Sequence, residues 1–329
     1  MREIVVKENE AGQRLDKLLA KYLNLAPKSF LYKMLRKKNI VLNGKKCDGA
    51  EKLQVDDRIQ MFLAEETIEK FSEVKVPVVK KKQLDIIYED DHVLLINKPA
   101  GMLSQKAKDT DESLVEYLIA YLLDSGQLTP EALRSFKPSV CNRLDRNTSG
   151  LVAAGKSLAG LQHLSAIFKD RSLHKYYVCI VAGKLMERQT ITGHLVKDDK
   201  TNQVTVYSTE QADSVPIFTE YEPLDWQNDG QNDYTLLKVT LITGRTHQIR
   251  AHLASIGHPL VGDYKYGNPA INEAAKRQYR ISSQMLHSWQ MEFPQMPRPL
   301  TDLSGKTFVA PIPAAFDRLW HRENKGDNR

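Results

Sequence analysis

The sequence predicts an α+β protein in which a small basic α/β domain precedes a larger domain built on a mixed, mainly antiparallel sheet. Three observations predict this class: two amphipathic helices near the N-terminus, a series of short β-rich runs from residue 85 onward, and no regular alternation of strands with helices. A chain of 329 residues is long enough for a compact core and one smaller module.

The N-terminal quarter begins with two predicted helices. Leucines recur at helical spacing over residues 14–23, which predicts an amphipathic helix. Pro27 is suited to open a second helix over residues 28–38, where apolar side chains form one stripe and basic side chains gather opposite it. One side of this second helix is therefore expected to face solvent or a polyanion.

A small hairpin sheet is expected after the helices. An apolar run at residues 40–42 precedes Asn43-Gly44, a strong signal for a tight turn, and residues 53–62 supply a further strand. Residues 13–63 resemble the small RNA-binding domain first known from ribosomal protein S-four, through the runs GQRLDKLL, KSFLYKMLRKKNIVLNGKK and VDDRIQ. The basic candidates for RNA contacts in this region are Lys33, Arg36, Lys37, Lys45 and Lys46.

Positive charge is concentrated in the same quarter of the chain. Residues 1–82 carry 19 Lys and Arg against 12 Asp and Glu, whereas the rest of the chain carries 28 against 29. A localised basic region is typical of a protein that binds a phosphate backbone. A lysine-rich surface that faces only solvent is the alternative interpretation.

The domain boundaries follow from changes in composition. Residues 1–63 are expected to form the small RNA-binding domain, and the charged, weakly periodic residues 64–84 a semi-flexible linker. This linker predicts that the two domains move relative to each other until RNA holds both. Residues 85–323 are expected to form the catalytic domain, and residues 324–329 a disordered tail.

Several β-rich runs and helices make up the predicted second domain. Apolar runs around residues 86–88 and 93–96 predict a hairpin, and further strands are expected at 151–154, 176–181 and 235–242. Helices are expected from about residue 158 to 168, at 111–123 and at 246–256.

Composition excludes several classes of protein. The three cysteines are dispersed and the nine histidines lack metal-ligand spacing, so neither a disulfide framework nor a metal site is expected. No run approaches the roughly 18–20 apolar residues of a membrane helix, and the N-terminus lacks a signal-peptide pattern. A cytoplasmic protein without a cofactor is the simplest interpretation.

The most informative segment is residues 142–150, with the sequence NRLDRNTSG. Asp145 stands between two arginines, whose guanidinium groups favour an ionised carboxylate. An ionised carboxylate held in a defined orientation can act as a nucleophile or base. An ordinary surface turn, with Asp145 accepting backbone hydrogen bonds, is the alternative.

The run RLDRNTSG resembles the signature of the RluA-type pseudouridine synthases, which include the RluC and RluD groups. The resemblance implies that Asp145 is the essential catalytic residue and that Arg143 holds the RNA and replaces the flipped-out base. The family usually has His before this arginine, where this chain has Asn142. Residues 96–102 (INKPAGM) resemble the family's NKPxG motif, although Ser104-Gln105 stands where a Val-His pair is usual.

Two later motifs agree with this resemblance in order and spacing. Residues 175–183 (KYYVCIVAG) resemble the family's tyrosine strand, which implies that Tyr177 stacks on the target base and removes its carbon 5 proton. A half-buried strand tyrosine is the alternative. Residues 241–253 (LITGRTHQIRAHL) imply that Arg250 pairs with Asp145, and Arg245 and His247 are further candidates for RNA contacts. An Arg250 that pairs with some other acid is the alternative.

The resemblance implies an isomerase that converts uridine to pseudouridine in structured RNA after flipping the nucleotide into a pocket. Large-subunit ribosomal RNA is the expected substrate, and tRNA remains open. The carboxylate could attack the sugar, attack the base or first remove a sugar proton. A non-catalytic RNA-binding or ribosome-assembly factor is the rival hypothesis. A methyltransferase is a third, although the chain lacks a Gly-rich nucleotide-binding turn.

Overall fold

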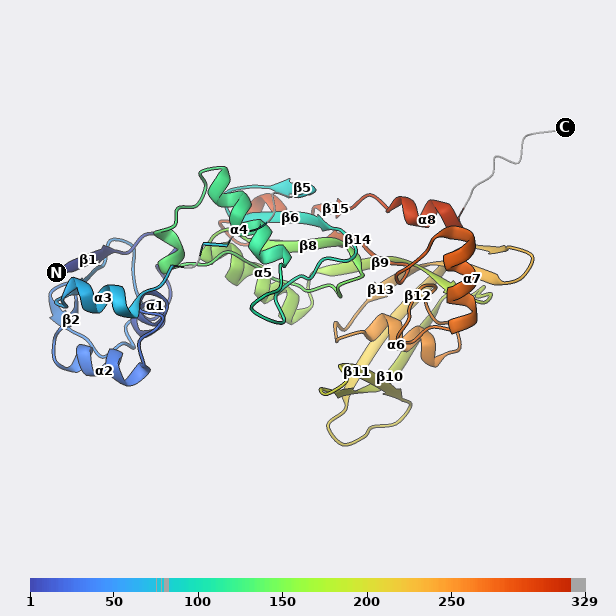
Figure 1. Ribbon diagram of the computed structural model, residues 1–329, viewed down its shortest axis with the longest axis horizontal. Coiled ribbons are helices and arrows are strands. Elements are labelled where there is room, and N and C mark those ends of the chain that lie inside the picture. The colour runs from blue at the N-terminus through green and yellow to red at the C-terminus, as the bar shows by residue number, and fades with distance from the viewer. Residues whose placement is uncertain (75, 78, 80–82, 321–329) are drawn as a thin grey trace.

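The computed structural model describes residues 1–74, 76–77, 79 and 83–320, which form an elongated molecule with a small N-terminal module at one end (Figure 1). The predicted tail at residues 324–329 and the lysines at 80–82 lie outside the described residues. Within the described residues, no helix is both long enough and apolar enough to cross a membrane.

The N-terminal module has its own four-stranded sheet, in the order β1-β4-β2-β3, and its own core. Each helix supplies an apolar stripe to that core, as the periodicity predicts. The elements are β1 (Arg2–Val5), α1 (Leu15–Tyr22), α2 (Lys28–Arg36), β2 (Ile40–Leu42), β3 (Lys45–Lys46), β4 (Arg58–Met61) and α3 (Glu65–Phe71).

Helix α3 corrects the prediction that residues 64–84 form a linker throughout. Ile68 of this helix is fully buried in the core of the N-terminal module, and Phe71 packs against the same core. The packed module therefore extends to Phe71. The charged residues of α3 conceal this on sequence grounds, because only one of its seven side chains is buried.

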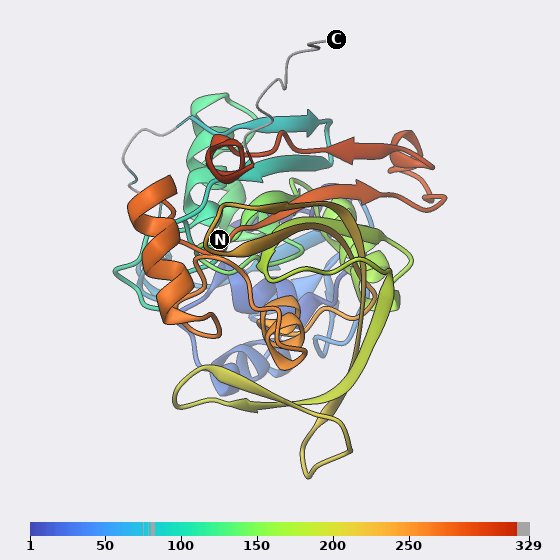
Figure 2. The ribbon, with the colours of Figure 1, turned by 90° about the vertical axis from the view of Figure 1, so that its right-hand side faces the viewer.

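The rest of the chain is organised by an 11-stranded sheet in the order β11-β10-β12-β13-β9-β14-β8-β6-β5, with β15 paired to β14 and β7 to β8. Among the named strands of the described part of the chain, β14 and β8 pair in parallel and the other pairs of this sheet are antiparallel. Strands β10 and β11 extend away from the body of this sheet (Figure 2). The predicted α+β class with a mainly antiparallel sheet is confirmed.

The strands of this part are β5 (Ile86–Glu89), β6 (Val93–Lys98), β7 (Ser139–Val140), β8 (Ser149–Gly155), β9 (His174–Ala182), β10 (Gln189–Asp198), β11 (Gln203–Tyr207), β12 (Val215–Asn228), β13 (Asp233–Leu241), β14 (Leu286–Glu292) and β15 (Thr307–Val309). The helices are α4 (Leu114–Asp124), η1 (Ala132–Arg134), α5 (Leu158–Asp170), α6 (Gln248–Ser255), α7 (Pro269–Tyr279), η2 (Thr301–Leu303) and α8 (Ala314–Leu319).

The central strands are buried on both faces, and alternate residues enter different cores. In β6, Leu94 and Ile96 join the core beneath α4 and α6, whereas Val93 and Leu95 join the core on the α5 side. Successive side chains of a strand point to opposite faces, so this division follows from the pleat. The core beneath α4 and α6, called the α6-side core below, also receives side chains from the segments that carry Asp145 and Tyr177.

The N-terminal module contacts the larger part directly. Ser135 Oγ donates to Glu10 Oε1 at 2.6 Å, and both residues are buried. The backbone N–H of Leu158 donates to Asn9 Oδ1 at 3.3 Å, and Arg134 donates to the Ser72 hydroxyl. The sequence predicts a semi-flexible linker and domains that move relative to each other until RNA holds both, whereas the structure joins them through these contacts.

Candidate active site

Asp145 lies in a tight loop between β7 and β8. The N–H of Thr148 donates to the carbonyl oxygen of Asp145 at 3.0 Å, which closes the turn. Leu144 anchors the loop in the α6-side core, and Gly150, the second residue of β8, has φ +108°. A side chain at Gly150 would place its Cβ 2.1 Å from the carbonyl oxygen of Ser288, so only glycine permits this close approach of β8 and β14.

Arg250 joins two carboxylates. Its Nη1 donates to Asp145 Oδ2 at 2.7 Å, and its Nε and Nη2 donate to Asp263 Oδ2 and Oδ1 at 2.7 and 2.9 Å. The contact expected between Asp145 and Arg250 is therefore present, together with a second acid that the sequence reasoning missed. Burial disfavours the charge on Arg250, but the hydrogen bonds to Asp263 outweigh it and raise the pKa of Arg250.

The two carboxylates differ in their access to solvent. The Asp263 side chain is 0% exposed and that of Asp145 is 26% exposed. Burial raises the pKa of Asp263, but Arg250 outweighs this effect and lowers it overall, so Asp263 is held as an anion. Asp263 orients the guanidinium, while one oxygen of Asp145 is fixed by Arg250 at an accessible surface.

Residues after β13 complete the surroundings of Asp145. His247 begins helix α6 with φ +53°, and its Nε2 lies 3.8 Å from Asp145 Oδ2. The Tyr266 hydroxyl lies 2.8 Å from His247 Nδ1, and the Arg250 guanidinium sits 5.1 Å from the centre of the Tyr266 ring. Burial lowers the pKa of His247, so this imidazole is neutral at pH 7.

Lys98 of the NKPxG segment connects that segment to the Asp145 loop through hydrogen bonds to backbone carbonyl oxygens. Its side chain is fully buried, and Nζ donates to the carbonyl oxygens of Pro99, Met102 and Arg146 at 3.0, 2.8 and 3.2 Å. Burial lowers the pKa of Lys98 to about 7. The sequence reasoning named this segment but assigned no role to Lys98, because spacing alone does not show that a lysine is buried.

The two adjacent tyrosines of β9 face opposite sides of the sheet, as predicted. Tyr177 is buried in the α6-side core, and burial raises its pKa to about 12. Tyr176 donates from its hydroxyl to Glu292 Oε2 at 3.1 Å, and the Lys238 ammonium lies 4.6 Å from its ring centre. Tyr177 therefore shares a face of the sheet with the segments that carry Asp145 and Arg250.

The departures from the family pattern have structural explanations. Asn142 donates to the carbonyl oxygen of Leu151 and accepts from the N–H of Ala153, so its amide fastens the loop to β8. Ser104 is buried, and its hydroxyl both donates to the carbonyl oxygen and accepts from the N–H of Leu144, each at 2.9 Å. Ser104 thus holds the backbone beside Asp145. Gln105 is exposed.

Every basic side chain predicted to contact RNA is accessible, whereas His247 is only partly so. Neither flanking arginine pairs with Asp145 within the described residues; the guanidinium that contacts it comes from Arg250, 105 positions away. This corrects the expectation that the sequence neighbours of Asp145 supply its positive field. The exposed side chains are Arg143, Arg245, Lys33, Arg36, Lys37, Lys45 and Lys46.

Beside the Asp145 loop lies a pocket of about 510 Å³, bordered by Lys98, Asn147 and Gln284. Asp145 itself is not among its lining residues. Among the described residues, no group of three or more His, Cys, Asp or Glu side chains is placed to hold a metal ion. The chemistry this geometry offers is that of an oriented, accessible carboxylate.

Comparison with known proteins shows which family this sequence resembles. A model of the RNA pseudouridylate synthase family matches residues 92–255. A ribosomal large subunit pseudouridine synthase C of Vibrio cholerae is 31% identical over 302 residues, which cover 88% of this chain and 88% of the relative. The chain belongs to the RNA pseudouridylate synthase family.

Further comparisons agree with the assignment of this synthase to its family. An uncharacterized RNA pseudouridine synthase of Mycoplasma genitalium is 30% identical, over 96% of this chain and 97% of the relative. The solved structure of human RNA pseudouridylate synthase domain containing 1 aligns with a TM-score of 0.54 at 23% identity, over 70% of this chain and 83% of that one. This likeness shows the fold.

The predicted RluA-type resemblance is confirmed, and the synthase is an isomerase that acts on RNA. The roles of individual residues remain predictions.

Proposed function

We propose that this synthase converts specific uridines of large-subunit ribosomal RNA to pseudouridine, with Asp145 as the catalytic carboxylate. The observation that carries the assignment is the hydrogen bond from Arg250 to a carboxylate that is still 26% exposed. The ribosomal target is supported by the names of relatives such as the Vibrio cholerae enzyme. A ribosomal substrate also fits the cytoplasmic location predicted from the sequence.

The proposed reaction begins when the target uridine leaves its stack, because its glycosidic bond cannot otherwise reach the carboxylate. Arg250 keeps Asp145 oriented through its hydrogen bond, and the carboxylate promotes cleavage of the glycosidic bond. The detached uracil then turns, and its carbon 5 bonds to the anomeric carbon. No redox change and no group donor is required for this isomerisation.

We assign Tyr177 a role in contacting the target uracil base rather than the RNA backbone. With its pKa raised to about 12 by burial, the phenol is neutral at pH 7. A neutral phenol cannot simply take up the carbon 5 proton and keep it, so its hydroxyl would pass the proton to a second acceptor. The ring would meanwhile pack against the uracil.

The N-terminal module is proposed to bind RNA in the manner of the S-four domain. Its support is the set of exposed basic side chains on α2, at the C-cap of α2 and on β3, namely Lys33, Arg36, Lys37, Lys45 and Lys46. Each lysine or arginine that neutralises a phosphate releases a counterion. Arg36→Ala is therefore expected to weaken RNA binding across sequences and to reduce its salt dependence.

The assignment is tested with Asp145→Asn, measuring RNA binding and pseudouridine formation separately on ribosomal RNA transcripts. Binding should stay within about threefold, while product formation falls below detection. Asp91→Asn, at an exposed aspartate away from the site, is the matched control and should retain full activity. Product formation by Asp145→Asn would reject the assignment.

The identity of the substrate needs a second experiment. Mapping pseudouridines in cells with and without the protein should show sites that disappear only from large-subunit ribosomal RNA. Loss confined to tRNA would overturn the ribosomal target. No change in any RNA, with binding retained, would favour a non-catalytic assembly factor.

A further inference from the structure

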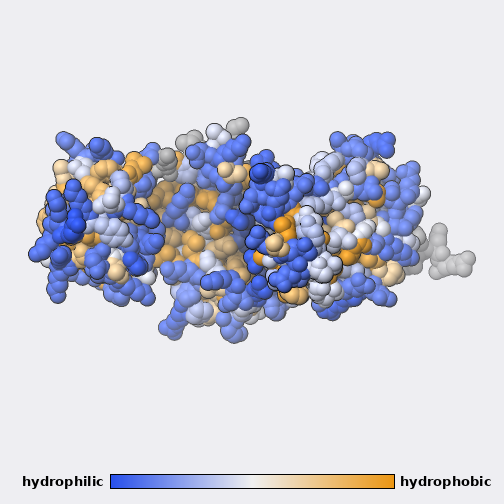
Figure 3. Space-filling model, turned by 90° about the horizontal axis from the view of Figure 1, so that it is seen from below, coloured by the Kyte–Doolittle hydropathy of each residue, from blue (hydrophilic) through white to orange (hydrophobic). Residues whose placement is uncertain are grey.

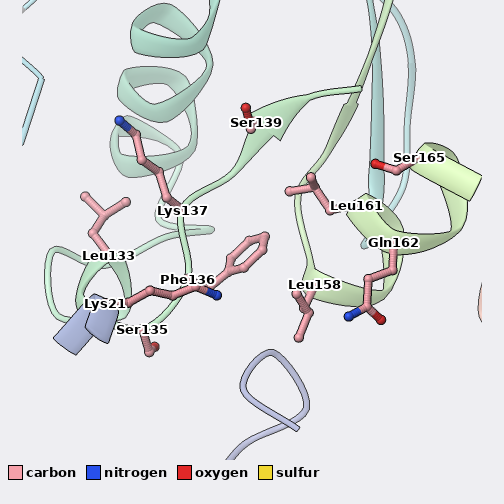
Figure 4. A pocket seen from close by; sticks show the side chains of 10 residues that line it. All are labelled: Lys21, Leu133, Ser135, Phe136, Lys137, Ser139, Leu158, Leu161, Gln162 and Ser165. Carbon is pink, nitrogen blue, oxygen red and sulfur yellow. The ribbon is translucent and has the colours of Figure 1, made fainter. Parts of the chain in front are cut away.

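A second pocket lies at the junction between the N-terminal module and the larger part of the synthase, away from Asp145. It has a volume of about 520 Å³, within the range of roughly 300–1,000 Å³ typical of ligand sites. One wall is the segment from η1 to β7, the other is helix α5, and Lys21 of α1 reaches it from the N-terminal module (Figure 4).

The walls of this junction pocket are mainly apolar. Figure 4 shows the Phe136 ring projecting from one wall toward α5, where Leu158 and Leu161 lie opposite. Both leucines are only partly buried. Hydrophobic residues are also visible in the recess beside the N-terminal module in Figure 3. Phe136 is only 4% exposed, so the apolar surface open to a ligand is mainly that of the two leucines, with the ring behind it. An apolar wall of this kind suits a flat group.

Polar side chains on the rim of the junction pocket supply hydrogen-bonding and charged groups beside its apolar walls. Gln162 is exposed, and its amide has no hydrogen-bond partner among the described residues. Lys137 is exposed, while Lys21 uses one of its three N–H donors on Gln13 at 2.8 Å. The nearby Glu10 carboxylate is already bonded to the Ser135 hydroxyl and the Lys7 N–H.

We propose that the junction pocket binds an unpaired nucleobase of the RNA substrate, with Lys21 and Lys137 contacting the adjoining phosphates. The proposal rests on the proposed function in so far as the bound RNA is the one modified. Proteins recognise unpaired RNA bases by stacking them on aromatic side chains and bonding their edges. Here the apolar wall of Leu158 and Leu161 would pack against the base, since apolar side chains also hold unstacked bases. Gln162 offers the contact to the base edge, and the lysines match the charge of the backbone.

The pocket is within reach of the same RNA segment as the active site. Ser139 lines the pocket and precedes Asp145 by six positions in the sequence. Six residues span at most about 20 Å even when fully extended. A base held in the junction pocket would therefore fix the RNA close to the uridine that is flipped out.

The test is a matched pair of substitutions on α5, Ser165→Glu and Ala166→Glu. Both residues are exposed and adjacent, but only Ser165 lines the pocket. The pair therefore separates a charge in the pocket from the same charge beside it. The probe is a transcript of large-subunit ribosomal RNA, and the readouts are Kd and the single-turnover rate at saturating enzyme.

Ser165→Glu should raise Kd about tenfold, in the lower part of the range for one stacked base, and leave the saturating rate unchanged. Ala166→Glu should stay within twofold. Cross-linking with a 4-thiouridine transcript should label residues 133–139 or 158–165. Equal Kd values for the two variants, or labelling only elsewhere, would overturn the proposal.

A transcript with an abasic site at the cross-linked nucleotide tests the base itself. It should bind wild type about as weakly as the intact transcript binds Ser165→Glu. Unchanged affinity for the abasic transcript would show that the pocket contacts only the backbone, which overturns the nucleobase assignment. Pseudouridine formation by wild type is followed in parallel, so failure of the ribosomal target is recognised independently of binding.

Discussion

Arg250 binds two carboxylates, Asp145 and Asp263, to which we assign different roles. The substitution Asp263→Asn tests the role of Asp263 separately from that of Asp145. Asp263 is fully buried and forms two hydrogen bonds to Arg250 through Nε and Nη2. The asparagine keeps the shape of the side chain but removes its charge and one acceptor. The buried guanidinium then loses the carboxylate that raises its pKa most, and Asp145 remains its one charged partner among the described residues.

The expected loss is large because a buried charge loses its partner. Removing one member of a buried ion pair costs about 3–5 kcal/mol of the free energy of unfolding, because the remaining charge is uncompensated. Asp145→Asn should cost less than about 1 kcal/mol, since Asp145 is partly exposed and makes one of the three bonds. Asp263→Asn should therefore impair stability and Asp145→Asn should impair chemistry.

Urea unfolding and single-turnover kinetics on a ribosomal transcript measure the two effects. Asp263→Asn should also lower the saturating rate, because a displaced guanidinium no longer orients Asp145. In a double-mutant cycle with Arg250→Gln, the double variant should be more stable than the sum of the single losses predicts. Additive losses, or an Asp263→Asn protein as stable as wild type, would refute the argument that Asp263 supports Arg250.

Three further predictions follow from single sites. Ser104→Ala leaves the N–H and carbonyl of Leu144 without their shared partner, so urea unfolding should show a loss of about 2 kcal/mol. Tyr177→Phe keeps the ring, so RNA Kd should be unchanged while the saturating rate falls about a hundredfold or more if the hydroxyl relays a proton. Burial lowers the pKa of His252 and of His287 to about 4, so the contribution of these two groups to stability is constant above pH 6.5. As pH falls from 6.5 toward 4, each of these histidines lowers the free energy of unfolding by about 1.4 kcal/mol per pH unit. His252→Asn should make this fall with pH less steep in urea unfolding, and an unchanged slope would contradict the prediction.

Periodicity predicted those elements whose pattern depends only on one buried face. The strand at β2 and the helices α1 and α2 appear within two residues of their expected bounds. Strands β10 and β12 were not predicted. The exposed residues of β10 are polar, whereas in β12 the apolar Phe218, Leu224 and Trp226 are exposed and obscure the alternation. In β12 the register also shifts between Pro223 and Asp225. A bulge of this kind breaks the period of two on which strand prediction rests.

The central pair of the site was anticipated only through resemblance. Nothing in the spacing of Asp145 and Arg250, 105 positions apart, reveals that they meet. Asp263 could have been found from the burial argument: a buried arginine with three donor nitrogens needs more than one oxygen partner. The role of Lys98 could not have been predicted in this way, because a lysine beside a proline turn is ordinarily exposed.

Charge placement explains why the N-terminal module matters to a site that it does not line. Outside residues 1–82 acidic side chains slightly outnumber basic ones, so that part of the protein has little overall attraction for RNA. The basic excess lies on a module that is fastened to the larger part by Glu10, Asn9 and Ser72. Because these contacts give the basic surface a fixed position, RNA bound to it as proposed would meet the Asp145 loop in a defined orientation. The module can thus contribute to the selection of a uridine as well as to affinity.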